Sequence, residues 1–172
     1  MLQPLILFRQ SLRTSLINCY RVKMVNFIKR KDKLKSFYEQ KRTFLLKNPK
    51  ERFFGFVKGE STAETDGQKR CDYVICFDMG PDDRPQEPSN YLFVELKGSD
   101  NEKALQQIVS TIYSLKQEGC LTGKKVDCFV VSGSCPSVKT KDQILKAKFP
   151  YRKPPYCYAL TFRTKQAEYE IK

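Results

Sequence analysis

The stretch "YLFVELKGSD", residues 91–100, decides how the surrounding sequence is interpreted, because it joins an apolar run directly to charged side chains. Residues 92–94 predict a buried strand, and Glu95 and Lys97 follow at once. Alternate residues of a strand point to the same face of a sheet. A carboxylate and an ammonium group are therefore expected side by side, with Leu96 pointing the other way. The pair is either a surface ion pair, worth about 0–1 kcal/mol, or part of a chemical site.

The segments around this stretch predict an α/β fold with a mixed central sheet flanked by helices. Strands are expected over residues 52–59, 71–79, 90–98, 124–133 and 156–164, and helices over 33–47 and 100–119. The residues of the first helix that are available for burial are Leu34, Phe37, Tyr38, Phe44 and Leu45. A proline-rich loop is expected over 80–90, and a basic irregular segment over 136–153. The helix between the third and fourth strands favours a crossover connection, which mixes parallel and antiparallel strands in one sheet.

The length of 172 residues suits one domain with a core, which we assign to residues 32–172. A basic extension precedes it over residues 1–31, with seven Lys and Arg residues and no acid. Its apolar residues Leu5, Phe8, Leu12 and Leu16 fall on one helical face. This composition is typical of a mitochondrial presequence, which would cover residues 1–23 and direct the protein to the matrix. The alternatives are an arm that packs on the domain or contacts phosphates, and translation from Met24.

The residue types present exclude several kinds of chemistry. The absence of histidine excludes serine–histidine and cysteine–histidine triads and histidine-ligated metals. The seven cysteines form no CxxC pair, and most lie in apolar runs, so the cytoplasm or another reducing compartment is expected. No nucleotide-binding glycine motif occurs, and no apolar run is long enough to span a membrane. Catalysis must therefore use carboxylates, lysines, hydroxyls or thiols.

The net charge of +13 is unevenly distributed along the chain. Counting Lys and Arg against Asp and Glu gives 15 against 3 in residues 1–58, 8 against 13 in residues 59–137, and 9 against 3 in residues 138–172. An acidic centre between basic arms suits an enzyme that holds phosphates with its arms and a cation at its centre. The alternative is a solvated surface with a basic tail.

Asp72 gives the pair at Glu95 and Lys97 a third member. It opens the predicted strand 71–79, and the pair closes the next strand along the chain. If the two strands are neighbours, all three charged groups meet at one edge of the sheet. Two carboxylates can bind Mg²⁺, and a lysine beside them can orient an attacking water and stabilise charge on a phosphate. Hydrolysis of a phosphodiester needs these groups and does not need histidine.

The pattern Asp72…Glu95-x-Lys97, on a strand pair followed by a helix, resembles the PD-(D/E)xK nuclease superfamily. The resemblance covers residues 33–133 and implies a restriction-endonuclease-like αβββαβ core. It further implies cleavage of nucleic acid, more often DNA than RNA, as an endonuclease or exonuclease that depends on Mg²⁺ or Mn²⁺. In that case Asp72 and Glu95 are metal ligands and Lys97 is the catalytic lysine. At position 71 this chain has cysteine where the motif has proline.

The resemblance also implies further polar residues and an assembly. Many members use another carboxylate, for which Glu39, Glu60 and Glu64 are candidates, and a glutamine of the following helix. Gln106 and Gln107 are the candidates for the glutamine, and we assign it to Gln107. A homodimer is expected by the same analogy.

Two basic runs are candidates for binding nucleic-acid phosphates, and both can equally be solvated segments. The residues assigned to this role are Lys29, Arg30, Lys31, Lys139, Lys141, Lys146, Lys148, Arg152 and Lys153. In the second run, Phe149 and Tyr151 are expected to stack on bases. The alternative function from another class is a nucleic-acid-binding module without catalysis, built on a degenerate nuclease fold.

Overall fold

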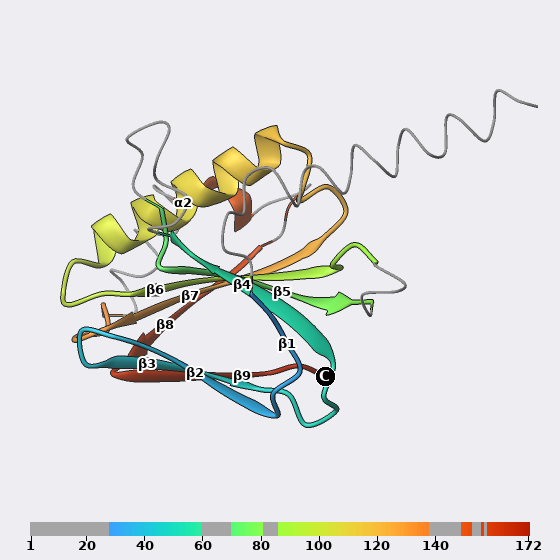
Figure 1. Cartoon of the computed structure of the whole chain (residues 1–172). Helices are drawn as coiled ribbons and strands as arrows, with labels where there is room; N and C mark the ends of the chain where they lie inside the picture. Colours follow the sequence, from blue (N-terminus) through green and yellow to red (C-terminus); the bar gives the residue numbers. More distant parts are fainter. Residues whose placement is uncertain (1–27, 60–69, 81–85, 138–148, 153–155, 157) are drawn as a thin grey trace, which may run out of the picture.

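In a computed structural model, the chain forms three layers, and the structure describes residues 28–59, 70–80, 86–137, 149–152, 156 and 158–172. Figure 1 shows an α-helix above a large sheet and a small sheet below it. The large sheet contains six strands in the order β1-β4-β5-β6-β7-β8, and the small one contains three in the order β2-β3-β9. The prediction of an α/β fold with a mixed sheet is confirmed.

The centre of the large sheet follows the predicted order of elements. Strands β4 (Phe53–Lys58), β5 (Tyr73–Met79) and β6 (Asn90–Leu96) form an antiparallel meander. The helix α2 (Asn101–Gln117) then crosses over to β7 (Lys125–Ser132), which runs parallel to β6. Strand β8 (Ala159–Thr164) pairs parallel to β7. Parallel neighbours need such a crossover, which is why the helix lies between β6 and β7.

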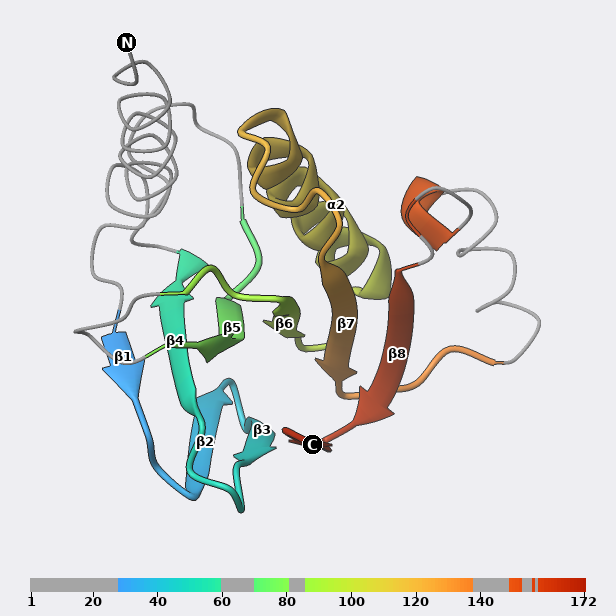
Figure 2. The ribbon, with the colours of Figure 1, turned by 90° about the vertical axis from the view of Figure 1, so that its right-hand side faces the viewer.

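The helix α2 begins in the polar segment that follows the apolar residues of β6. The Asp100 side chain accepts a hydrogen bond from the Lys103 N–H at 2.9 Å, which caps the first turn. Its buried residues recur at helical spacing and face the large sheet: Ala104, Leu105, Gln107, Ile108, Thr111, Ile112 and Leu115. Figure 2 shows the helix lying over β7. No helix in the described parts of the chain is long and apolar enough to cross a membrane.

The prediction of a helix over residues 33–47 is wrong, because this segment forms the hairpin of β2 (Leu34–Glu39) and β3 (Arg42–Lys47). Phe44 and Leu46 alternate in β3 and are both fully buried, as a strand requires. Of the residues expected to be buried, Leu34 and Tyr38 are 59% and 63% exposed. Helix-favouring Lys, Glu and Leu residues are therefore overridden by packing of this hairpin on the large sheet.

Besides β2 and β3, two further short strands were not expected from the sequence. Strand β9 (Gln166–Glu170) pairs parallel to β3 and completes the small sheet, which covers the face of the large sheet opposite α2. That face is therefore covered by a sheet and not by a helix in the described structure. Strand β1 (Ile28–Arg30) pairs antiparallel to β4 at the edge of the large sheet. The sheet thus includes residues that composition assigned to the N-terminal extension.

The core consists of two apolar layers. One lies between α2 and the large sheet, and the other lies between the two sheets. The first layer includes Phe149 and Tyr151, which are 1% and 6% exposed, on either side of the start of the short 3₁₀ helix Pro150–Arg152. The expectation that these two rings stack on bases is therefore wrong, since both are core side chains.

Candidate active site

The first pair of candidate residues, Asp72 and Glu95, lies across neighbouring strands. Tyr73 of β5 pairs with Val94 of β6, so the antiparallel register puts Asp72 opposite Glu95. The Asp72 N–H donates to Glu95 Oε2 at 3.0 Å, and the Leu96 N–H donates to Asp72 Oδ2 at 2.6 Å. The two carboxylates are thus held together where β5 begins and β6 ends, as the sequence pattern predicted.

Lys97 completes the group. Its Nζ lies 3.0 Å from Glu95 Oε1, and the two side chains are 21% and 0% exposed. Oε1 makes no hydrogen bond of normal geometry with any described residue, so this contact is ionic. Burial and then the charge of Asp72 raise the pKa of Glu95 from 4.5 to about 8, although Lys97 lowers it. The lysine therefore offsets only part of the cost of burying this carboxylate.

The backbone around Asp72 is fixed by close packing. The Gly59 N–H donates to the Asp72 carbonyl at 2.9 Å. A Cβ atom at Gly59 would lie 2.0 Å from the Cys71 carbonyl oxygen, so only glycine allows this approach. The Cys71 N–H donates to Thr111 Oγ1 of α2 at 2.9 Å, a bond that proline at this position could not make. The helix thus holds the segment that carries Asp72.

Gln107 of α2 also holds the segment that carries Asp72. It is 8% exposed, and its Nε2 donates to the Arg70 carbonyl at 2.9 Å, two residues before Asp72. Its Oε1 is buried and has no hydrogen-bond partner among the described residues. Gln106, the other candidate glutamine, is exposed. The structure therefore brings Gln107 next to the segment that leads into β5, where it positions the backbone.

Among the residues that the structure describes, a third carboxylate does not join Asp72 and Glu95 in a metal-binding group. Within the ranges that the structure describes, no three Asp, Glu or Cys side chains gather closely enough to hold a metal ion. Glu39 is the last residue of β2 and does not join Asp72 and Glu95 in such a group. Glu60 and Glu64 lie outside the described residues.

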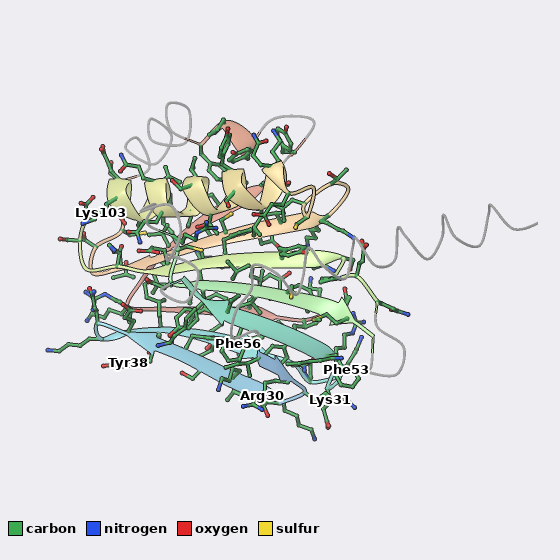
Figure 3. All side chains as sticks on the ribbon, turned by 45° about the horizontal axis from the view of Figure 1, so that its top comes forward. Arg30, Lys31, Tyr38, Phe53, Phe56 and Lys103 are labelled. Carbon is green, nitrogen blue, oxygen red and sulfur yellow. The ribbon has the colours of Figure 1, made fainter. Side chains whose placement is uncertain are left out.

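The predicted phosphate-binding residues of the first basic run lie far from this group. Lys29 and Lys31 lie over the Phe53 ring, with Nζ at 4.6 Å and 4.9 Å from its centre. Phe53 pairs with Met79 at the opposite end of β5 from Asp72, about 20 Å along the strand. In Figure 3, Arg30 and Lys31 lie across the molecule from Lys103, in the first turn of α2.

The second basic run gives no test of the prediction. Lys139, Lys141, Lys146, Lys148 and Lys153 lie outside the described residues, as does the side chain of Arg152.

Lys58 is a basic residue near Asp72 that the sequence did not single out. It pairs with Tyr73 in the strand register, and its Nζ lies 5.9 Å from the centre of that ring. A lysine at the end of a strand is too common to indicate a functional residue by itself. Only the pairing of β4 with β5 shows that Lys58 lies near Asp72.

Comparisons of the chain with protein-family models, with curated proteins and with solved structures found no match.

Proposed function

We propose that the protein is a divalent-metal-dependent nuclease with its active site at Asp72, Glu95 and Lys97. The observation that carries the proposal is the convergence of these three side chains from two neighbouring strands, with Lys97 at 3.0 Å from Glu95. The order β4-β5-β6-α2-β7 supports it, since this is the strand, strand, strand, helix, strand part of the restriction-endonuclease-like core. The substrate class is nucleic acid, with DNA preferred by analogy.

The two carboxylates fit Mg²⁺ or Mn²⁺. Magnesium in proteins is commonly bound by one or two carboxylates, with waters and substrate phosphates completing its shell. Glu95 Oε1 is a buried oxygen that faces the Lys97 ammonium at 3.0 Å and makes no hydrogen bond of normal geometry among the described residues, so its surroundings already suit positive charge. Asp72 and Glu95 would hold the ion. When bound, it would stabilise negative charge on the phosphoryl group and make a nearby water easier to deprotonate.

The protein side chains have separate roles in this proposal. Asp72 and Glu95 bring two carboxyl groups to one point, and the reciprocal backbone hydrogen bonds keep them there. The Lys97 ammonium is partly exposed, so it can donate to a phosphate oxygen while remaining near Glu95. Preorganised charge of this kind costs little rearrangement as negative charge develops on the phosphorus oxygens. Gln107 acts through the Arg70 backbone as a positioning residue.

A panel of labelled substrates tests the proposal. Single-stranded, duplex and branched DNA, and RNA, would be incubated with the wild-type chain and Mg²⁺, Mn²⁺ or EDTA. We expect cleavage of at least one substrate with metal and none with EDTA. Asp72→Asn keeps the shape and an oxygen acceptor for the Leu96 N–H, and should abolish cleavage. Binding of every substrate without metal-dependent cleavage would favour a nucleic-acid-binding module and overturn the proposal.

A further inference from the structure

Three separate parts of the chain meet at the end of the large sheet where the parallel strands β6, β7 and β8 finish. Lys97 lies at this same end. The turn between β2 and β3 consists of Gln40 and Lys41, with φ of 46° and 61°. The turn between β8 and β9 is Lys165, with φ of 63°. Its N–H donates to the Ser132 carbonyl at 3.0 Å, and its carbonyl accepts from the Thr43 N–H at 3.0 Å. These hydrogen bonds join the small sheet to the end of the large one.

The side chains of the first turn lie against the segment that follows Lys97. A Cβ atom built at Gly133 would lie 2.7 Å from Arg42 Nη2 and 2.8 Å from the Gly98 carbonyl oxygen. A Cβ atom at Gly98 would lie 3.9 Å from Gln40 Oε1. The absence of a side chain at Gly133 therefore lets the Arg42 guanidinium approach the ends of β6 and β7.

The positive charge at this end of the sheets comes from one oriented guanidinium and two exposed ammonium groups. Arg42 Nη1 donates to the carbonyls of Gln40 and Lys41, at 3.1 Å each, which orients the guanidinium. Arg42 Nε is a buried donor without a hydrogen-bond partner among the described residues. Lys41 and Lys165 are exposed, and neither forms an ion pair within the described structure. A planar guanidinium flanked by two lysines matches the charge and hydrogen-bonding capacity of phosphate oxygens.

The backbone of the turns adds to this observation. Left-handed φ values for residues other than glycine cost about 1–2 kcal/mol each, and such costs are concentrated at functional sites. Here Gln40, Lys41 and Lys165 adopt them at one end of the two sheets, and Glu51 and Asp78 adopt them elsewhere; at Gln40 and Lys41 this is the geometry of a two-residue hairpin turn. Asparagine or glycine would adopt these conformations at lower cost, but would not supply the two lysine charges.

We propose that Lys41, Arg42 and Lys165 form a binding site for the backbone phosphates of a nucleic-acid strand passing beside Lys97. The choice of ligand rests on the proposed nuclease function, because these residues lie at the same end of the large sheet as Lys97, on the side of the small sheet, where a strand cleaved on the α2 side would pass around that end. Binding at this site recognises the phosphate backbone and is independent of base sequence.

The test compares two triple variants of the full chain that remove the same charge. Lys41→Gln/Arg42→Gln/Lys165→Gln removes the proposed site. The control, Lys50→Gln/Lys125→Gln/Lys172→Gln, removes three exposed charges at the opposite end of the strands. Affinity for fluorescent single-stranded and duplex oligonucleotides would be measured by anisotropy in EDTA over a range of salt concentrations. A double variant, Lys41→Gln/Lys165→Gln, keeps the Arg42 hydrogen bonds and guards against loss of the hairpin.

We expect the site variant to bind roughly tenfold more weakly or worse, with a salt dependence of log K smaller by about 0.7–0.9 for each phosphate that the variant no longer binds. The double variant should show the same change to a smaller extent, and the control should bind as the wild type does. Equal losses of affinity in both triple variants, or none in either, would overturn the inference. Cleavage in Mg²⁺ is scored separately, so that a chain that binds as expected without cleaving contradicts only the nuclease proposal.

Discussion

Asp72 and Glu95 each accept a hydrogen bond from the backbone of the other's strand: Glu95 Oε2 from the Asp72 N–H at 3.0 Å, and Asp72 Oδ2 from the Leu96 N–H at 2.6 Å. The two carboxyl groups are therefore held together by the pairing of β5 with β6. Neither side chain can turn away without leaving a backbone N–H unpaired, which costs about 1–3 kcal/mol for a buried group. The charge of Asp72 therefore helps to raise the pKa of Glu95, and a bound cation would lower it.

The first prediction concerns pH. The pKa of Glu95 is about 8 in the folded chain against an ordinary value of 4.5, because of burial and the charge of Asp72. Between these values the folded state holds a proton that the unfolded state has lost. The Glu95 contribution to stability is therefore complete below pH 4.5, and it declines as the pH rises to about 8.

Glu95→Gln removes this contribution to the slope, which is at most about 1.4 kcal/mol per pH unit. Urea denaturation of both chains in EDTA at pH 5, 6, 7 and 8 should show the variant gaining stability relative to the wild type as the pH rises. A constant difference across this range would contradict the assignment, since Glu95 is the group that the substitution removes from titration.

The second prediction concerns Gly59. A methyl group there would meet the Cys71 carbonyl oxygen at 2.0 Å, which forces β4 away from the segment that leads to Asp72. We expect Gly59→Ala to lower the free energy of unfolding by about 2 kcal/mol or more. Gly98→Ala is the matched control beside Lys97, because its Cβ would meet only Gln40 Oε1 at 3.9 Å. Thermal unfolding of the two variants checks this, and equal stability would show that the approach of Gly59 is not required.

The third prediction separates the two adjacent glutamines of α2. Gln107→Ala removes the hydrogen bond to the Arg70 carbonyl, and should cost about 1–3 kcal/mol of stability together with a loss of kcat. Gln106 is exposed, so Gln106→Ala should change neither quantity measurably. If Gln107 acts by positioning, Gln107→Glu should not restore kcat, because its carboxylate cannot donate to the carbonyl. Full activity in Gln107→Ala would exclude this role.

The fourth prediction tests the hairpin of β2 and β3. Phe44 is fully buried and Tyr38 is 63% exposed, whereas a helix over residues 33–47 was expected to bury both rings. Phe44→Ala should cost about 3–5 kcal/mol of stability, and Tyr38→Ala should change it by no more than about 0.5 kcal/mol. Chemical denaturation of the two variants provides the comparison, and similar large losses of stability for both would contradict the hairpin.

Sequence patterns predicted the central strands and the helix α2 because their signals are local. An apolar run identifies β6, and apolar residues at helical spacing after an acidic first turn identify α2. The sequence also predicted that Asp72 and Glu95 lie opposite each other, because each stands at the charged end of a strand and the two strands are consecutive in the chain. The small sheet was not predicted, because β3 pairs with β9 about 120 residues later; the alternation of polar and apolar residues in Gln166–Glu170 was a strand signal that the prediction missed. The same long-range pairing brings Lys165 to Arg42, so no local signal could have placed those residues at the site.

The rate of cleavage of one labelled substrate by the wild-type chain and by Lys97→Ala, with Mg²⁺ and excess protein, tests the central claim most directly. Lys103→Ala, which removes an exposed lysine from the first turn of α2, is the matched control. The account predicts a fall of about 10²–10³-fold for Lys97→Ala, with an unchanged rate for Lys103→Ala and folded protein in both cases. A Lys97→Ala chain that is folded and cleaves at the wild-type rate would contradict it.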